Sequence, residues 1–221
     1  MADAPWSLRG EAMFAWCGSR QIVVAERYET SPVGPYVALG VARVTRLGAR
    51  LGLCFTTMVV DNHDRLADGR RNWGFPGEIG TLTWANVADE SVLVWHERGI
   101  EVRGLARGRV FPLVAPSRFL QHRADGPVVV PVRMTGRARR ARVEVRAPAD
   151  DELYALRGEH RGLVVRGLAT RLHVARVPAG RLWSARAPAG APESAMVQRT
   201  VAARAASPTT KCAAATGGLH R

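Results

Sequence analysis

Short strand-like runs, each closed by a turn, constrain the fold of this 221-residue chain more than any other feature. Residues 36–46 and 51–60 flank Leu47-Gly48-Ala49-Arg50, the pattern of a hairpin with a four-residue turn. Residues 142–146 alternate charged and apolar side chains, as a half-buried strand does. About ten such runs follow one another with little helix between them. We therefore predict a mainly β fold, a curled antiparallel sheet or β-barrel with a few short helices.

The composition indicates one domain followed by a tail. Hydrophobic residues make up 47% of the chain, as in globular proteins. From residue 187 onward Ala, Pro, Ser and Thr dominate, and Pro188, Pro192 and Pro208 interrupt any helical pattern. We expect residues 5–186 to form a single β domain and residues 187–221 to form a flexible Ala/Pro-rich tail.

The sequence predicts a cytoplasmic protein. Its first residues, MADAPWSLRGE, lack the basic-then-apolar order of a secretory signal. No apolar run approaches the ~18–20 residues that a membrane span needs, so no membrane partner is expected. The three cysteines (Cys17, Cys54 and Cys212) have unrelated spacings, which favour neither a disulfide framework nor a metal site and fit a reducing compartment.

The chain is strongly basic, with a net charge of +13, and Lys211 is the only lysine among its 32 basic residues. Such charge favours polyanion binding. The arginines are spread along the sequence, however, which also fits a compositional bias. The densest cluster, residues 137–142, is expected to form a solvated hairpin turn. No nucleic-acid-binding motif is present, so nucleic acid is not an expected partner.

Residues 59–80, VVDNHDRLADGRRNWGFPGEIG, organise the first half of the chain. They predict the end of a strand and then a short helix capped by Asp61 or Asn62. Arg70-Arg71 lies near the helix C-terminus, where the helix dipole favours cations. The segment Trp73-Gly74-Phe75-Pro76-Gly77 cannot continue the helix, because proline lacks an N–H and two glycines loosen the backbone.

This stretch resembles the acetoacetate decarboxylase superfamily, whose signature is G-R-x-x-W-G-[FI]-P-K-E-[LI]. Gly69-Arg70, residues 73–76 and Glu78-Ile79 match it. Residues 6–10 are similar to the family's opening W-x-L-x-G segment, and residues 29–36 to its strand–turn–strand segment ending in Y-x-E-L. The resemblance covers most of residues 6–80. It implies a barrel-like antiparallel domain, usually a homo-oligomer, with a small apolar cavity for a β-keto acid or related oxo acid.

Two departures from the family pattern bear on chemistry. Gly77 stands where the family keeps the lysine that forms an imine with the substrate ketone, and Ala38 stands at the glutamate position of Y-x-E-L. Imine formation requires a neutral primary amine, which an arginine guanidinium cannot supply. The resemblance therefore implies a barrel that is retained without imine catalysis. No cofactor is expected.

The resemblance also implies the site residues. Glu78 is the expected catalytic residue, by acid–base or enol chemistry. The expected substrate-binding residues are Arg9, Tyr36, Trp73, Phe75 and Gly77. Two alternatives remain open: Trp73 and Phe75 pack beneath the loop, and Arg9 is an ordinary surface arginine. Residues 61–64 contain two acids and a histidine but also read as a helix start, so no metal site is predicted.

Three functions follow from these observations. The leading one is an acetoacetate-decarboxylase-like protein that binds a small oxo acid or related carbonyl compound, as a binding protein or as an enzyme without an imine. The second is an active lyase, a decarboxylase or aldolase-like enzyme that takes its amine from Lys211 or the N-terminus. The third is an arginine-rich polyanion-binding protein.

Overall fold

The computed structural model describes residues 1–178, and the predicted tail at 187–221 lies outside them. The strands are β1 (Trp6–Cys17), β2 (Gln21–Thr30), β3 (Tyr36–Leu47), β4 (Arg50–Val60), β5 (Glu78–Ile79), β6 (Leu82–Val87), β7 (Glu90–Trp95), β8 (Ile100–Arg123), β9 (Gly126–Arg146) and β10 (Gly158–Leu172). The helices are α1 (His63–Trp73) and the 3-10 helix η1 (Glu152–Leu156).

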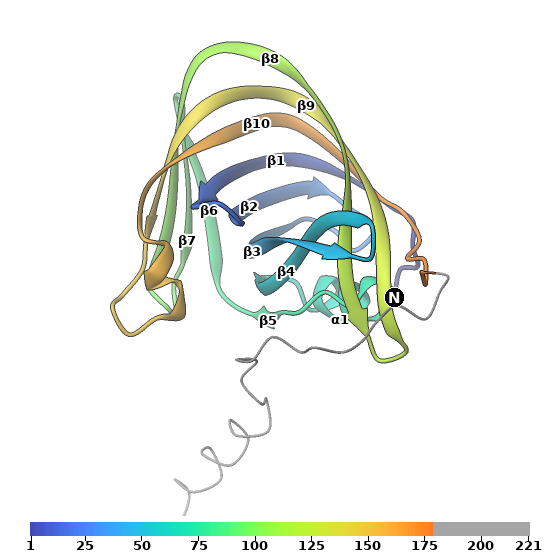
Figure 1. The fold of residues 1–221 in the computed structure, drawn as a ribbon. Coiled ribbons are helices and arrows are strands. Elements are labelled where there is room, and N and C mark those ends of the chain that lie inside the picture. Colours follow the sequence, from blue (N-terminus) through green and yellow to red (C-terminus); the bar gives the residue numbers. More distant parts are fainter. Residues whose placement is uncertain (179–221) are drawn as a thin grey trace, which may run out of the picture. The chain divides into compact units, whose positions relative to one another are not determined.

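The strands form one curled sheet in the order β5-β4-β3-β2-β1-β10-β9-β8-β7-β6 (Figure 1). Neighbouring strands are antiparallel except for the short β4–β5 contact. The sheet closes on itself where β4 meets β8, at Leu53 opposite Phe119. The strands from β4 through β1 and β10 to β8 thus form a barrel, and β6, β7 and the first part of β8 extend beyond it. The prediction of a mainly β, curled antiparallel fold is confirmed.

The long β8–β9 hairpin is the part of the fold that the sequence did not reveal. Its strands pair continuously except at a bulge between Arg107 and Phe111, where Gly108 adopts a φ of 71°. Residues 137–142 lie in the middle of β9, so the expectation of a solvated hairpin turn there is wrong. Pro112 and Pro116 contributed to this miss, because proline within a run of residues argues against a strand. Here both prolines are tolerated, since at these positions β8 pairs with β9 on one edge only and its other edge needs no N–H donor.

Two hydrophobic cores lie on opposite faces of the strands β1–β4. Alternate residues of β2 show the division, because Val24 and Tyr28 enter one core while Val23 and Ala25 enter the other. The first, the barrel core, fills the space that the closed strands enclose and includes residues of α1 and of the loop after it. The second, the outer core, lies between the barrel wall and β7 with the first half of β8.

Helix α1 follows β4 and closes one end of the barrel core (Figure 1). Asn62 is the N-cap, and its side chain accepts a hydrogen bond from the Arg65 N–H at 2.8 Å. Gly74 ends the helix in the left-handed conformation, with a φ of 70°. The predicted short helix is therefore present, with Asn62 rather than Asp61 as its cap.

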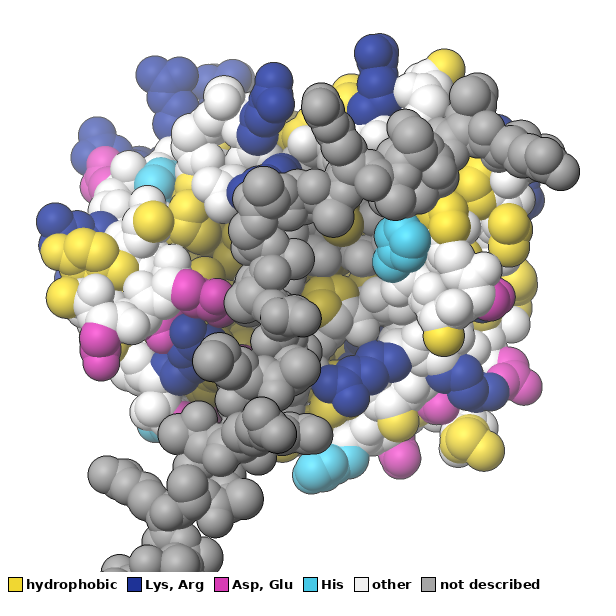
Figure 2. Space-filling model, turned by 60° about the horizontal axis from the view of Figure 1, so that its bottom comes forward, with side chains coloured by type: hydrophobic (Ala, Val, Ile, Leu, Met, Phe, Trp, Pro, Cys, Tyr) yellow, Lys and Arg dark blue, Asp and Glu magenta, His cyan; other side chains and the backbone are white. Residues whose placement is uncertain are grey.

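No helix within residues 1–178 has the length and apolar character needed to cross a membrane. On the face shown in Figure 2, the Lys and Arg side chains are spread around the rim and interleaved with acidic ones. This distribution fits a compositional bias better than it fits a single basic track.

Trp73 supports the base of the barrel core. Its side chain is fully buried, and its Nε1–H donates to the carbonyl of His173 at 2.8 Å. Its ring meets the Trp6 ring edge to face, with centroids 5.0 Å apart.

We expect Trp73→Ala to lower the free energy of unfolding by about 3–5 kcal/mol, because a large cavity and an unpaired carbonyl replace the ring. The matched control is Trp16→Ala, since that ring is 44% exposed, and its loss is expected to cost less than about 1 kcal/mol. Urea denaturation of both variants measures the difference. Equal small losses would contradict the packing described here.

Candidate functional site

Helix α1 places the side chain of Arg65 inside the barrel core, where it is 4% exposed. The guanidinium carbon lies 5.8, 5.4 and 5.3 Å from the ring centroids of Trp6, Tyr36 and Phe75. Nη2 approaches the Met58 sulfur at 3.9 Å, a weak acceptor, and Nε has no hydrogen-bond partner within residues 1–178. A buried cation with a free donor is costly, so this position favours an anionic ligand.

Gly69 makes room for this guanidinium. A Cβ atom at position 69 would lie 2.0 Å from Nη1 of Arg65. Glycine in the interior of a helix costs about 1 kcal/mol relative to alanine. Here the missing side chain at position 69 leaves room for the Arg65 side chain to lie along its own helix and point into the barrel.

Glu26 supplies a carboxyl group to the same core. It lies opposite Ala38 in the β2–β3 pair, so the two residues share one face of the sheet. Burial raises the pKa of Glu26, against the lowering effects of its hydrogen bond from Tyr28 and of the Arg65 charge. A carboxyl group on β2 thus lies directly opposite the position where the resemblance implies a glutamate.

Two tyrosines extend this polar cluster. The Tyr28 hydroxyl lies 3.0 Å from Glu26 Oε1 and 3.1 Å from Thr170 Oγ1. With one proton available, it donates to the carboxylate and accepts from Thr170. The Tyr36 hydroxyl is buried and has no partner within the described residues. Burial raises the pKa of Tyr36 to about 12, although the Arg65 charge acts in the opposite direction. The Tyr36 hydroxyl therefore keeps its proton at neutral pH and lies close enough to the Arg65 guanidinium for that charge to act on its pKa.

Glu26 is half-buried, so part of it remains accessible to solvent. Half-buried apolar side chains pack against the barrel core from the surrounding strands. They include Phe14, Ile22, Phe111, Leu113, Met134 and Leu163. The part of the interior that these described residues form is therefore mainly apolar, and it receives the Arg65 cation and the Glu26 carboxyl group.

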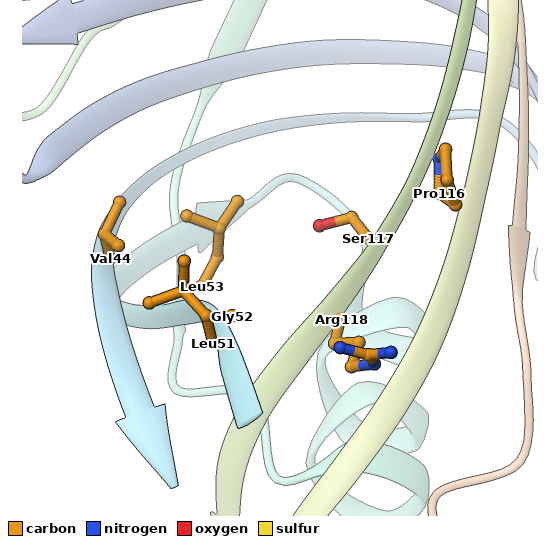
Figure 3. Close-up of a pocket in the computed structure, with 7 residues that line it drawn as sticks. All are labelled: Val44, Leu51, Gly52, Leu53, Pro116, Ser117 and Arg118. Atoms are coloured by element: carbon orange, nitrogen blue, oxygen red, sulfur yellow. The ribbon is translucent and has the colours of Figure 1, made fainter. Parts of the chain in front are cut away.

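A pocket of about 440 Å³ lies where the closure of the barrel is incomplete (Figure 3). Its lining consists of Val44, Leu51, Gly52 and Leu53 from β3 and β4, and Pro116, Ser117 and Arg118 from β8. Figure 3 shows the Ser117 hydroxyl directed across the gap toward the β3–β4 hairpin. Leu53 also packs against the barrel core. This seam pocket therefore borders the wall of the barrel interior.

Three of the predicted binding residues lie together in the barrel core: Tyr36, Trp73 and Phe75. The Trp73 and Phe75 ring centroids are 5.8 Å apart. Both aromatic residues also pack beneath the loop, as the alternative interpretation had it. Their roles in binding stay predictions.

The other predicted site residues lie outside this cluster. Arg9 is exposed on β1, on the face opposite to Leu8. Glu78 is exposed on β5, and its Oε1 lies 3.5 Å from Nη1 of Arg98. A Cβ atom at Gly77 would meet Leu66 Cδ1 at 3.0 Å and the Met58 carbonyl oxygen at 3.3 Å. A side chain at position 77 would thus start in a tight contact rather than in open space.

Sequence reasoning missed Arg65 and Glu26. Glu26 carried a usable signal, because its position midway between Val24 and Tyr28 puts all three residues on the same face of a strand. For Arg65 the only signal was the glycine four residues later in a predicted helix. That signal is weak in a chain with so many arginines.

No family model matches the chain, and no curated protein matches it in sequence. Solved structures do resemble it. An acetoacetate decarboxylase from Legionella pneumophila subsp. pneumophila str. Philadelphia 1 has a TM-score of 0.58 and 15% identity, with 82% of this chain and 90% of that chain covered. The enduracididine biosynthesis enzyme MppR complexed with pyruvate has a TM-score of 0.57 and 13% identity, with 80% and 91% covered.

A further acetoacetate decarboxylase structure has a TM-score of 0.54 and 14% identity, with 82% of this chain and 92% of that chain covered. At these identities the similarity establishes the fold. Residues 1–178 therefore have the acetoacetate decarboxylase fold that the sequence motifs predicted.

We expect Gly69→Ala to destabilise the protein by about 1–3 kcal/mol, because the added methyl group forces the tightly packed guanidinium to move. In a protein that already carries Arg65→Ala, the same change should be neutral or stabilising, as alanine favours helix. Urea denaturation of the two single variants and the double variant measures this coupling. Additive effects would show that Arg65 does not lie against position 69.

The raised pKa of Glu26 predicts a pH dependence of stability. A carboxyl group whose pKa is higher in the folded state favours folding while protonated and loses that contribution as the pH rises through its folded-state pKa. Relative to Glu26→Gln, the wild-type protein should therefore lose stability as the pH rises from 4 toward 7. Urea denaturation across this range measures the difference, and a relative gain by wild type would contradict it.

Proposed function

We propose that the protein binds a small oxo acid inside the barrel and pairs its carboxylate with Arg65, without imine catalysis. The observation that carries this proposal is the buried Arg65 guanidinium, whose Nε donor has no partner among the described residues. The acetoacetate decarboxylase fold supports it, since a protein of this fold, MppR, is complexed with pyruvate.

Arg65 and Tyr36 suit the carboxylate end of such a ligand. A guanidinium binds a carboxylate through two parallel N–H donors, and these charge-assisted hydrogen bonds are stronger than neutral ones. The free Tyr36 hydroxyl supplies a further donor. Binding would satisfy both buried groups at once, which lowers the cost of keeping them in the interior.

Glu26 suits the carbonyl end. Because burial raises its pKa, this carboxyl group retains a proton to higher pH than an exposed glutamate. A protonated carboxyl group can donate a hydrogen bond to a ketone oxygen. The half-buried apolar side chains around it would contact the rest of a small organic acid. The seam pocket is the proposed route to the interior.

The absence of a suitable amine argues against imine chemistry. Position 77 is glycine, and Lys211 lies outside the described residues. The alternative, an active lyase that uses Lys211 or the N-terminal amine, is tested below. Glu78 remains the catalytic residue that the resemblance implies. It is exposed and pairs with Arg98, however, so we favour Glu26 as the carboxyl group that contacts a ligand inside the barrel. A homo-oligomer in the cytoplasm also remains a proposal.

We expect Arg65→Gln to weaken pyruvate or acetoacetate binding by about 10-fold or more, the scale of one lost charge-assisted hydrogen bond. Tyr36→Phe should weaken binding less and should not destabilise the free protein, because it removes a buried hydroxyl that has no partner. The matched control is Arg9→Gln, which removes the same charge from the exposed arginine that the resemblance favoured. Isothermal titration calorimetry measures all three.

Equal affinities for wild type and Arg65→Gln, in a variant shown to be folded by circular dichroism, would reject the role of Arg65. Borohydride reduction in the presence of the same acids separates the binder from the lyase. The proposal predicts no adduct in the intact mass of wild type. A stable adduct at Lys211 or at the N-terminus would favour the lyase instead.

A further inference from the structure

Three arginines converge on one pocket outside the barrel. Arg137 of β9 lies directly opposite Arg166 of β10, and Arg139 lies two residues further along β9 on the same face. All three line a pocket of about 430 Å³. Its other wall includes Ala88 and Asp89, the turn between β6 and β7. We call this space the arginine pocket.

Arg166 and Arg139 are held in place by carboxylates. Arg166 donates through Nη1 to the buried Glu11 and through Nη2 to the Ser91 hydroxyl at 3.1 Å. Arg139 donates to Asp89 Oδ1 at 2.5 Å and to the Gly108 carbonyl at 3.1 Å. Because these side chains are already ordered, a ligand that binds them loses less conformational entropy.

Arg137 is different, since within residues 1–178 no carboxylate pairs with it. Like charges directly opposite one another in a sheet are destabilising. The strands β9 and β10 contain two more arginine pairs of this kind, Arg133 with Arg171 and Arg142 with Arg161. Neither pair lines the arginine pocket. The lining of that pocket has three guanidinium groups; Asp89 pairs with Arg139 and Glu11 pairs with Arg166, so the net positive charge of the pocket comes from Arg137.

A second pocket extends this charged surface. It has a volume of about 290 Å³, and it shares Arg166 and Gly167 with the arginine pocket. Gly167 has a φ of 58° in the β10 bulge, so the chain turns there without a side chain between the two pockets. Arg9 and Arg27 line this second part together with Glu11 and Glu29, and Arg27 pairs with these two acids at 2.8 and 2.5 Å. Arg9, which forms no salt bridge within residues 1–178, adds one further cation next to the three that converge.

We propose that the arginine pocket binds a small phosphate-type oxyanion, such as the diphosphate or phosphate group of a metabolite. The arginine pocket is separate from the proposed oxo acid site, because Arg137, Arg139 and Arg166 face away from the barrel core. Phosphate oxygens accept hydrogen bonds from several guanidinium groups at once, which suits three converging arginines. The volume lies within the range of small-molecule sites. Binding would also neutralise the Arg137–Arg166 repulsion.

A long polyanion such as nucleic acid suits this site less well. Its binding requires a continuous track of cations along the surface. The Asp89 carboxylate forms part of the pocket wall and would repel the phosphates of a strand that crosses it.

The test is titration calorimetry of the full chain with inorganic pyrophosphate at a constant ionic strength of ~0.15 M, which screens weak surface charges. Wild type should bind at one saturable site. Arg137→Gln should raise the Kd by about 10-fold or more, the loss expected for a charge-assisted hydrogen bond. Arg133→Gln is the matched control, because it removes the same charge from an exposed cross-strand pair of the same two strands. Its Kd should stay within about twofold of wild type.

Three results would overturn the proposal: no saturable binding by wild type, equal weakening in the two variants, or undiminished binding in Arg137→Gln. A short DNA duplex, titrated in parallel, tests the alternative partner. Tighter binding to the duplex, weakened equally by both substitutions, would show a diffuse polyanion surface in place of a site. Arg137 is exposed, and thermal unfolding of each variant confirms that it folds.

Discussion

The Arg65 guanidinium must be held inside the barrel although it forms no salt bridge with any of the residues 1–178, and much of the surrounding structure serves that requirement. Aromatic rings on the N-terminal strand, on β3 and on the loop after α1 surround the cation. Such rings attract a cation through their electron-rich faces but do not satisfy its N–H donors. Gly69 supplies the space, at a cost to helix stability. In the proposed function, a bound anion would supply the hydrogen-bond acceptor that the Arg65 Nε donor lacks among residues 1–178.

The signature motif predicts the fold of this protein better than it predicts the chemistry, because most of its residues serve packing. Trp73 and Phe75 are core residues that join α1 to the base of the barrel. Gly74 ends the helix, and the Gly77 carbonyl accepts a hydrogen bond from Arg70. These residues are required for packing whatever the reaction is. The imine-forming lysine that the resemblance implies is the exception in this motif, because the chain has glycine at position 77.

The sequence predicted the curled antiparallel sheet, the short capped helix and the hairpin of β3 and β4, because alternation and turn residues are local signals. It did not predict the β8–β9 hairpin. The bulge at Gly108 and the edge prolines interrupt the alternation, and only the distant partner strand shows that pairing continues. Of the candidate site, Tyr36, Trp73 and Phe75 were found through the motif. Arg65 and Glu26 were not, because their proximity results from the packing of α1 across the end of the barrel core.

The most direct test of this account is a crystal structure of the protein soaked with pyruvate. The account predicts electron density for the ligand inside the barrel, with its carboxylate within hydrogen-bond distance, about 2.7–3.0 Å, of the Arg65 guanidinium and near the Tyr36 hydroxyl. No covalent bond should join the ligand to the protein. Ordered pyruvate bound elsewhere, with the Arg65 guanidinium unpaired, or a covalent adduct to an amine, would contradict it.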